Sequence, residues 1–519
     1  MNTISPPTGK QQLVGKFLAM QSPLELLQRL PVRNFKTHSQ KIEHGDVFVC
    51  RQGLTWDSHL SVDDAIKRGA VAVIANRPLD VDIPCIVTPS HSSSISLINQ
   101  FYQYPQDTIK HIGVTGTNGK TTVAYCLNSL FNQETPSAYT GTLGSYFGDA
   151  HFPLDNTTPD AITLLNLFHR MQQNDITHHV MEVSSHALSQ DRVSIVDFDA
   201  VLITNIGTDH LDYHKSREDY IQAKLRLIDR LKPNGVAVIN LDDDLAAAMI
   251  ERCRSRARVV TFSHQNENAD LVASKLKASC EGGEYEVRYQ HHKCHVKTNL
   301  PFMFNIEKTL AMLAMMVALE APLGVAVSRL STLKPAPGRC EVYRLPNQAR
   351  AIIDYAHNQD SLSNLLMNVR QHSHKGRIYT VIGVTGDRLG DAAEIGKLCS
   401  LHSDHVFFTT DNPLGVCQDA LFAALTSQVE GNNATVVYDR ALCIKKAVSC
   451  LAEGDVLLLC GKGHETHQYI SSNKNEASPY IGDLAALMSA SKQNVWHGEH
   501  QRETGEQHIP QPESTEDQQ

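Results

Sequence analysis

The segment Gly113-Val-Thr-Gly116-Thr-Asn-Gly119-Lys120-Thr121-Thr122 has the residue types and spacing of a phosphate-binding loop. Glycines let the backbone curl so that successive N–H groups face an anion, and a following helix adds its positive N-terminal end. Lys120 can reach the terminal phosphates of a nucleotide, and the Thr121 hydroxyl can ligate Mg²⁺. The strict loop pattern has glycine where Val114 stands, so a plain strand-to-helix turn is the alternative. The Lys-Thr-Thr ending favours the nucleotide site.

Two other segments place a carboxylate and an imidazole directly after predicted strands. Glu182 ends a short apolar run, and His210 follows the run Ala200–Thr204. Because the carboxyl ends of parallel strands meet at the ligand-binding edge of a sheet, we expect both side chains beside the phosphate loop. A carboxylate and an imidazole next to phosphate suit Mg²⁺ held partly by water. The Thr157-Thr158-Pro159 turn and Ser184-Ser185-His186 are expected to add hydroxyls and a donor there.

Short apolar, β-branched runs alternate with helical sequence from Ile109 onward, which predicts a mostly parallel sheet with crossover helices. Two prolines and a glycine interrupt this pattern at Lys334–Gly338, after which it restarts. The predicted strands are Gly45–Cys50, Ile109–Val114, Val180–Val183, Ala200–Thr204, Val236–Asn240, Ala351–Asp354, Ile378–Val384, His405–Thr410 and Val456–Cys460, with a helix at Val123–Leu130.

We therefore predict an α/β protein of three domains and a tail. Residues 1–108 form a smaller α/β domain, 109–335 a doubly wound phosphate-loop domain, and 336–492 a Rossmann-like α/β domain. Residues 493–519 are rich in Gln, Glu, His and Pro, which predicts disorder.

Composition limits the possible functions. The chain of 519 residues is 41% hydrophobic and carries a formal net charge of −9, which argues against a nucleic-acid-binding surface. No apolar run approaches the ~20 residues of a membrane span, and Met1–Lys16 lacks the features of a signal peptide. The 12 cysteines are scattered singly, so we expect reduced thiols rather than a zinc site. These features predict a cytoplasmic protein without membrane insertion.

Together the motifs resemble the Mur ligase family, in the family's order and spacing, over about residues 25–485. Within the family they resemble the branch that adds the third amino acid of the peptidoglycan stem. The matching segments are Gly113–Thr122, Glu182–Leu188, Asn205–His214, Tyr220–Lys224, Pro337–Arg339, Asp354–Asn358 and Gly461–Glu465.

The resemblance implies an ATP-dependent, ADP-forming ligase that activates a carboxylate as an acyl phosphate and joins it to an amino acid. It implies a first domain for a UDP-linked muramoyl peptide, a central ATPase, and a third domain that closes over the nucleotide and brings in the amino acid. The expected partners are these small molecules, with ATP and Mg²⁺ as cofactors, no nucleic acid, and a monomeric chain.

The resemblance also implies roles for individual residues. The implied catalytic residues are Lys120, Glu182, His210 and Lys224, with Lys224 carbamylated. The implied cation ligands are Thr121, Glu182, His210 and Lys224. The implied ATP contacts are Gly116, Thr117, Asn118, Gly119, Lys120, Thr121, Thr122, Asn305, Arg339, Asp354 and His357. The implied substrate contacts are Ser39, Thr157, Thr158, Ser184, Arg192, Asp411, Asn412, Gly461 and Glu465.

Several positions depart from the family pattern. Leu414 stands where enzymes selecting diaminopimelate carry an arginine, and Lys308 where the family usually has a second asparagine. Thr37–Gln40 keeps Ser39 but loses the usual neighbours in Asp-Ser-Arg. Glu394–Lys397 is closer to the Mur-type domain of cyanophycin synthetase. Two alternatives follow: a paralogue ligating an amino acid to another acceptor in a specialised pathway, and an inactive Mur-like binding protein.

Overall fold

The computed structural model describes residues 22–53, 56–254, 256–373, 376–472, 476–491 and 496–497. The chain divides into two compact units, with the boundary between Ala336 and Pro337 and with Ser279–Glu281 belonging to the second unit. This boundary falls inside the proline-containing segment Lys334–Gly338.

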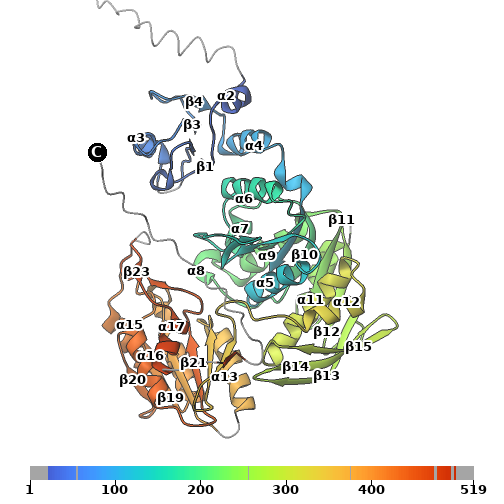
Figure 1. Ribbon diagram of the computed structural model, residues 1–519, viewed down its shortest axis with the longest axis vertical. Helices are drawn as coiled ribbons and strands as arrows, with labels where there is room; N and C mark the ends of the chain where they lie inside the picture. The colour runs from blue at the N-terminus through green and yellow to red at the C-terminus, as the bar shows by residue number, and fades with distance from the viewer. Residues whose placement is uncertain are drawn as a thin grey trace, which may run out of the picture. The chain divides into compact units, whose positions relative to one another are not determined.

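The first unit begins with a small parallel sheet, in the order β1-β2-β3-β4 (Figure 1). Its strands are β1 (Phe35–Lys36), β2 (Val47–Val49), β3 (Ala72–Ala75) and β4 (Cys85–Val87). The helical segments around it are α2 (Pro23–Arg29), η1 (Ser39–Lys41), η2 (Ser58–Ser61), α3 (Val62–Lys67), α4 (His91–Phe101) and η3 (Pro105–Thr108).

A larger sheet fills the rest of this unit, in the order β15-β14-β13-β12-β11-β10-β5-β9-β6-β7-β8. The strands from β6 to β13 through β9, β5, β10, β11 and β12 pair in parallel, while β6-β7-β8 and β14-β15 are antiparallel. The bounds are β5 (Lys110–Thr115), β6 (Ser137–Gly141), β7 (Gly144–Phe147), β8 (Ala150–Phe152), β9 (His178–Glu182), β10 (Phe198–Ile203), β11 (Leu231–Asn240), β12 (Arg258–Ser263), β13 (Leu271–Ser279), β14 (Gly282–Tyr289) and β15 (His292–Thr298).

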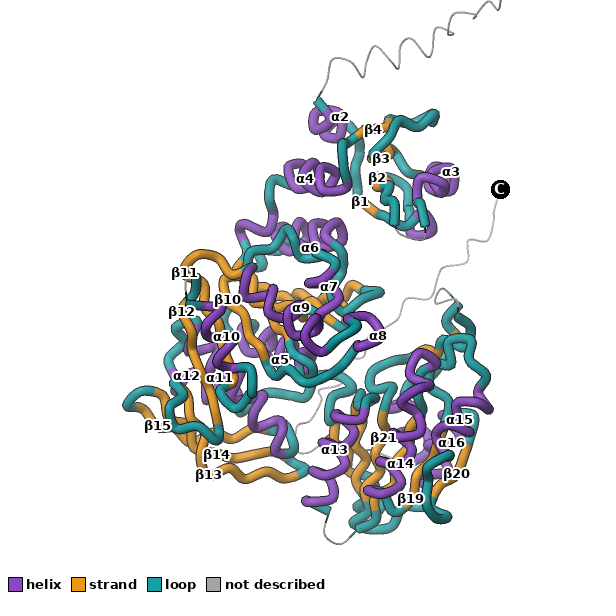
Figure 2. The backbone as a smooth tube through the Cα atoms, turned by 180° about the vertical axis from the view of Figure 1, so that it is seen from behind, coloured by secondary structure: helices purple, strands orange, loops and turns teal. Residues whose placement is uncertain are grey.

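Eight helices accompany this sheet in the described residues, and both faces are covered. They are α5 (Lys120–Phe131), α6 (Ala161–Gln173), α7 (Ser185–Ser189), α8 (Leu211–His214), α9 (Arg217–Asp229), α10 (Ala246–Cys253), α11 (Met303–Ala318) and α12 (Leu323–Leu330). Helix α6 also lies against α4 of the small sheet (Figures 1 and 2). There Asn166 of α6 accepts from Phe35 N at 3.2 Å and donates to Phe35 O at 2.7 Å.

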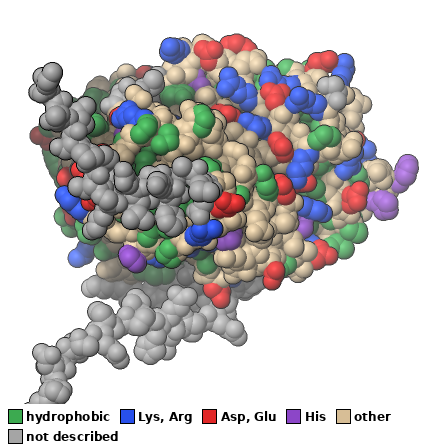
Figure 3. Space-filling view, turned by 90° about the horizontal axis from the view of Figure 1, so that it is seen from above, with side chains coloured by type: hydrophobic (Ala, Val, Ile, Leu, Met, Phe, Trp, Pro, Cys, Tyr) green, Lys and Arg blue, Asp and Glu red, His purple; other side chains and the backbone are tan. Residues whose placement is uncertain are grey.

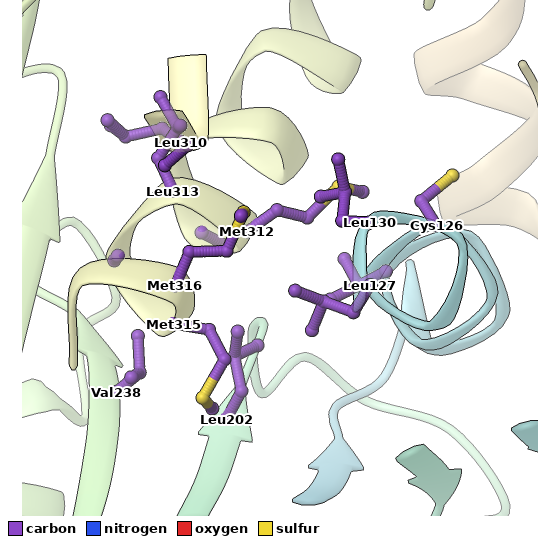
Figure 4. Packing of buried hydrophobic residues seen from close by; sticks show 14 of the residues in the cluster. Cys126, Leu127, Leu130, Leu202, Val238, Leu310, Met312, Leu313, Met315 and Met316 are labelled. Atoms are coloured by element: carbon purple, nitrogen blue, oxygen red, sulfur yellow. The ribbon is translucent and has the colours of Figure 1, made fainter. Parts of the chain in front are cut away.

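The core under the phosphate loop is built by α11 and α5. Met312, Met315 and Met316 of α11 pack in one buried cluster with Leu127 of α5 and Leu202 of β10 (Figure 4). Burial of side chains this size contributes about 1.5–3 kcal/mol each. The same packing fixes the N-terminal turns of both helices, where the polar residues of the site begin.

The second unit is a sheet in the order β20-β19-β18-β21-β17-β16-β24, parallel except at β16. Its strands are β16 (Glu341–Arg344), β17 (Arg350–Asp354), β18 (Ile378–Ile382), β19 (His405–Phe408), β20 (Ala434–Val436), β21 (Val456–Cys460) and β24 (Trp496–His497), with a separate pair β22 (His467–Gln468) and β23 (Ser478–Pro479). Its helical segments are α13 (Gln359–His372), η4 (Gly386–Asp391), α14 (Ala392–His402), α15 (Gln418–Thr426), α16 (Arg440–Ser449) and α17 (Asp483–Ser491).

The predicted fold class, α/β with a mostly parallel central sheet, is confirmed, and each predicted strand is present with bounds shifted by a few residues. The antiparallel additions at both edges of the central sheet were not predicted. Of the tail predicted to be disordered, the structure describes only β24, and the other residues of 493–519 lie outside the described residues.

The surface seen in Figure 3 mixes the two signs of charge, with lysine and arginine interspersed among aspartate and glutamate. Among the described residues, no helix combines the length and the apolar character needed to cross a membrane.

Candidate active site

The phosphate loop joins β5 to α5 and is shaped by two glycines. Gly119, the residue before α5, has a φ of +86°, a left-handed conformation that glycine adopts without strain. At Gly116 a Cβ atom would lie 1.9 Å from Thr204 Oγ1, so no larger residue fits. The end of β10 holds the loop, because Asn118 N donates to Asn205 Oδ1 at 3.0 Å. The loop is thus set at the N-terminus of α5, where an anion is favoured.

Lys120 is the first residue of α5, and its side chain folds back onto the loop. Its Nζ donates to Gly116 O at 2.8 Å and to Thr117 O at 3.0 Å. Phosphate oxygens carry charge and are stronger partners for an ammonium group than carbonyl oxygens. The ammonium is therefore placed where a bound phosphate can take over these bonds. Thr121 and Thr122 follow on α5, and both are buried.

Glu182 is the last residue of β9 and is completely buried. Its Oε2 accepts from Thr121 Oγ1 at 2.9 Å, and its Oε1 accepts from Thr142 N at 2.9 Å. Tyr139 OH and Thr142 Oγ1 donate to it as well. All of these donors are neutral, so the cluster orients the carboxylate without cancelling its charge. Glu182 and Thr121 are the predicted cation ligands that the structure joins directly.

The side chains at the predicted cation site can be compared with the ligands that Mg²⁺ needs. Among the described residues, no three His, Cys, Asp or Glu side chains are grouped so that they could hold a metal ion. Mg²⁺ does not need such a cage, because it keeps several waters and binds through one or two carboxylates together with substrate phosphates. The Glu182 carboxylate and Thr121 hydroxyl beside the phosphate loop fit that requirement.

Lys224 lies on α9, and its side chain is buried under the loop, with the residue only 1% exposed. Its Nζ donates to Gly116 O at 2.7 Å and lies 4.6 Å from the centroid of the Tyr220 ring. Burial lowers the pKa of Lys224 well below its usual range, and the neighbouring Lys120 charge lowers it further, while Asp209 acts in the opposite direction. The surroundings of Lys224 therefore disfavour the charged form of the amine relative to water.

His210 precedes α8 with a left-handed φ of +53°. Its Nε2 lies 3.7 Å from Asp209 Oδ2, and its ring meets the His186 ring edge-on with centroids 4.8 Å apart. His186 packs in turn on the Tyr213 ring at 4.2 Å. The side chain is 42% exposed, unlike those of Glu182 and Lys224. Asp209 and His186 therefore orient His210.

Four predicted substrate contacts gather around the end of β9. Their bonds are Thr157 Oγ1 to Thr142 Oγ1 at 3.2 Å, Thr158 Oγ1 to Glu182 O at 2.8 Å, Ser184 N to Thr158 Oγ1 at 3.0 Å, and Arg192 Nη1 to Thr158 O at 3.0 Å. Ser39, the remaining predicted substrate contact in the first unit, lies in η1 beside the small sheet. Its hydroxyl bonds to Asp64, which lowers the pKa of that carboxyl.

Asn305 is buried on the first turn of α11, and its amide is engaged at both ends. Its Nδ2 donates to Pro301 O at 2.6 Å, and its Oδ1 accepts from Lys308 Nζ at 2.9 Å. Lys308 also lies over the Phe304 ring, with Nζ 4.5 Å from the centroid. Asn305 and Lys308 thus form one hydrogen-bonded pair at the start of α11.

In the second unit, the predicted nucleotide contacts surround Tyr355. The Arg339 guanidinium lies over the Tyr355 ring at 4.3 Å, and His357 Nδ1 donates to Tyr355 O at 2.8 Å. Asp354 Oδ2 accepts from Cys340 N at 2.8 Å. Tyr355 OH donates to Glu465 Oε1 at 2.8 Å, which links this group to the predicted amino-acid contacts.

The predicted amino-acid contacts converge on Lys462, a residue that was not predicted. Lys462 has no exposed surface. Its Nζ donates at 2.7 Å to each of Asn412 Oδ1, Glu465 Oε2 and His467 O, and lies 3.5 Å from Asp411 Oδ1.

The residues around Lys462 have shifted pKa values and leave little space for larger side chains. Burial raises the pKa of Asp411 to about 6, with Lys462 opposing the rise. Burial alone would also raise the pKa of Glu465, but Lys462 and the hydrogen bonds lower it overall. A Cβ at Gly461 would lie 2.7 Å from Asp411 Oδ2, so glycine is required there. With both acids ionised, two carboxylates face one ammonium, and the surplus negative charge suits a substrate ammonium group.

Comparisons with known proteins agree with this arrangement. Residues 114–316 match the model of the Mur ligase middle domain, and residues 338–463 match the Mur ligase, glutamate ligase domain. The chain is 34% identical over 461 residues to a UDP-N-acetylmuramoyl-L-alanyl-D-glutamate--2,6-diaminopimelate ligase of Oceanobacillus iheyensis, covering 86% of this chain and 93% of that protein. This chain belongs to the Mur ligase family.

Solved structures of Mur ligases share its fold. A structure of a UDP-N-acetylmuramoyl-L-alanyl-D-glutamate--2,6-diaminopimelate ligase matches with a TM-score of 0.61 and 29% identity, over 89% of this chain and 95% of that one. The MurF ligase of Thermotoga maritima in complex with ADP matches with a TM-score of 0.62 over 91% of this chain and 98% of that one, at 18% identity, which shows the fold alone. As a Mur ligase, this chain is an ATP-dependent, ADP-forming enzyme that works with a divalent cation.

Four groups of this Mur ligase were missed from the sequence. Tyr139 and Thr142 orient Glu182 from β6 and the turn after it. His186 was noted only as a donor, yet its ring packs against His210. Lys462 carried a usable signal, since it lies inside the matched segment Gly461–Glu465.

Proposed function

We propose that this Mur ligase joins an amino acid to the free D-glutamate carboxylate of UDP-N-acetylmuramoyl-L-Ala-D-Glu, adding the third residue of the peptidoglycan stem. The observation that carries the proposal is the Glu182–Thr121 pair beside the phosphate loop, in a chain that covers 93% of a relative bearing that substrate in its name. The first unit supplies the groups for phosphoryl transfer, and the second supplies the carboxylates for an ammonium group.

The residues that would hold Mg²⁺ are Glu182 and Thr121, with phosphate oxygens and water completing its shell. The cation would neutralise phosphate charge at the end of β9, so that an anionic carboxylate can approach an anionic phosphate. Tyr139 and Thr142 keep the Glu182 oxygens oriented for this task. His210 would bind a second cation, oriented by Asp209 and His186.

Lys224 would serve as a carbamate rather than as an ammonium group. A neutral amine adds to CO₂ through its nitrogen lone pair and loses one proton, which gives an anionic N-carboxylate. The buried position of Lys224 beside Lys120 favours the neutral amine that this addition needs. The resulting carboxylate would lie next to Lys120 and, like His210, would be a ligand for the second cation.

The reaction would have two steps, with Lys120 acting in the first and the carboxylates of the second unit acting in the second. Lys120 exchanges its bonds to Gly116 O and Thr117 O for phosphate oxygens. A carboxylate oxygen of the acceptor attacks the γ-phosphorus, ADP leaves, and an acyl phosphate remains. The neutral amine of the amino acid attacks the acyl carbon, phosphate leaves, and the nitrogen loses a proton. Glu465 and Asp411 would hold the amino acid during this step.

The amino acid would have a far end that is not a carboxylate. Leu414, in the segment after Asp411 and Asn412, offers an apolar side chain where a carboxylate would need a cation. Its backbone N donates to Tyr469 O at 3.0 Å, which fixes this segment. Lysine satisfies this requirement, and it carries no second carboxylate.

The decisive experiment supplies UDP-N-acetylmuramoyl-L-Ala-D-Glu with ATP, Mg²⁺ and single amino acids from a panel, and follows phosphate release and product mass. We expect turnover with lysine or another amino acid lacking a far carboxylate. Lys120→Ala, expected to abolish turnover and keep the fold, is the matched inactive control. Turnover only with a non-UDP peptide acceptor would support a specialised pathway, and no turnover with either acceptor would contradict ligase activity.

A further inference from the structure

Lys308 reaches the phosphate loop from a different helix than Lys120 does. A Cβ atom at Gly119 would lie 3.3 Å from Lys308 Cε, 3.7 Å from Cδ and 3.8 Å from Cγ. The aliphatic part of Lys308 therefore covers the last glycine of the loop. Its ammonium group, one bond beyond Cε, is not among these three nearest atoms and lies at least 3.8 Å from the same position. The N-terminus of α5, where a nucleotide phosphate is favoured, begins at the next residue.

Two neutral groups help to fix the position of Lys308, and its charge also interacts with the carboxylate of Glu307 on the same helix. Nζ donates to Asn305 Oδ1 at 2.9 Å and lies 4.5 Å from the Phe304 ring centroid. Both groups are neutral. The Asn305 amide is itself fixed, because its Nδ2 donates to Pro301 O at 2.6 Å. The Lys308 charge also acts on Cys126 of α5, whose pKa burial raises and Lys308 counteracts. The Lys308 charge is therefore close enough to α5 to act on a side chain of that helix.

We propose that Lys308 is a second ammonium contact to the phosphates of the bound nucleotide, approaching from α11 while Lys120 approaches from α5. This inference rests on the nucleotide site of the proposed function and adds a residue to it. Buried side chains of α11 and α5 pack in one cluster (Figure 4). This packing holds the two helices together and so keeps Lys308 over Gly119. Asn305 then acts through Lys308 as a positioning residue, with its amide oxygen directing the ammonium.

The test measures nucleotide affinity of the full chain, by displacement of a fluorescent ADP analogue with ATP, ADP and adenosine in Mg²⁺ buffer. Lys308→Met keeps the aliphatic part and removes the charge. We expect it to weaken ATP and ADP by about 10- to 100-fold, the range for losing a charged hydrogen bond, and to leave adenosine within about twofold. Lys308→Arg should restore most of the affinity. No acceptor is needed, so the result is independent of which substrate is ligated.

Salt dependence gives a second readout. The affinity of the unaltered chain for ADP should fall more steeply with KCl than that of Lys308→Met, because one charge contact is lost. Lys297→Met is the matched control: Lys297 lies on β15, is 68% exposed and pairs with Glu284, so its loss should change neither affinity nor slope.

Three results would overturn the assignment. Unchanged ATP and ADP affinity in Lys308→Met would exclude the contact. An equal loss for adenosine would place the effect on the base or on the fold. A loss that Lys308→Arg does not restore would show that packing, not charge, is responsible. If Lys308→Met does not fold, Lys308→Gln is measured in the same way, with the same criteria.

Discussion

Lys224 and Lys462 are both buried lysines, one in each unit, but their surroundings differ. Lys462 contacts two carboxylates, at 2.7 Å and 3.5 Å, and donates three hydrogen bonds. Lys224 donates to one carbonyl oxygen and faces a tyrosine ring, with another lysine nearby. Burying a charge is expensive unless it is paired. The Lys462 ammonium is therefore paired and organises its neighbours, whereas burial and the nearby Lys120 charge disfavour the charged form of Lys224.

The largest expected effect comes from removing the Lys462 ammonium group. Lys462→Met leaves Asp411 and Glu465 buried without their cation, and breaking a buried pair in this way costs about 3–5 kcal/mol. We expect a lower melting temperature by circular dichroism and, in protein that remains folded, a raised KM for the amino acid with an unchanged KM for ATP. Lys462→Arg should recover part of the stability, because the charge is kept but the space is tight.

Lys445→Met is the control for that measurement, because Lys445 is exposed on α16 in the same unit. It should leave both the melting temperature and the two KM values unchanged. A Lys462→Met protein as stable as the original, with normal amino-acid KM, would show that the carboxylates do not depend on this ammonium.

Removing Lys224 should have the opposite effect: stability should be kept, and activity should be lost. Lys224→Met replaces a buried amine by an apolar chain, so stability should be unchanged or raised. Activity should fall by about 10²–10³-fold, the range for losing one group that stabilises transition-state charge. The unaltered enzyme should also lose activity when CO₂ and bicarbonate are stripped from the assay and regain it when bicarbonate is returned. Activity that is indifferent to CO₂ would contradict the carbamate.

This contrast also marks how much the sequence could predict. The phosphate loop and the strands around it are local patterns, so Gly116–Thr122 and Glu182 were predicted with their neighbours. Lys224 is one polar residue on a helix, and nothing local indicates that the fold buries it. Lys462 bonds Asn412, which is 50 positions away in the chain. The antiparallel strands β6-β7-β8 were missed because they are short and because Gly141 and Gly144 flank their first turn.

The His111–His179 pair is a third way to bury ionisable groups, in which neither is charged. The rings lie side by side on β5 and β9, with their Nδ1 atoms 3.1 Å apart. Burial lowers the pKa of His111 to about 4, with Lys232 lowering it further and Gln106 O and Asp199 opposing. Burial, followed by the charge of His111, lowers the pKa of His179 well below its usual range.

Because both histidine pKa values are lowered in the folded state, acidification should destabilise the fold. The unfolded imidazoles titrate near pH 6.5, so between about pH 6.5 and 4 the unfolded chain binds more protons than the folded one. The folded state is therefore favoured fully above pH 6.5 and loses stability on acidification, by up to about 3 kcal/mol for His111. The urea concentration at the unfolding midpoint should decrease when the pH is lowered from 7.5 to 5. In the His111→Leu/His179→Leu double variant that fall should shrink, and an equal fall would assign it to other groups.

The smallest expected effect adds a charge beside the Lys462 network. Leu414→Arg places a guanidinium group after Asn412, in a region where the ionised carboxylates outnumber the one ammonium, so the change should be tolerated. A substrate carboxylate could then pair with the new cation, and we expect the ratio of kcat/KM for diaminopimelate over lysine to rise about tenfold. Leu414→Gln, which adds hydrogen-bonding atoms but no charge, should shift the ratio much less. Equal ratios in both variants and the original enzyme would mean that Leu414 does not contact the far end of the amino acid. Selectivity would then have to reside in side chains other than those around Lys462.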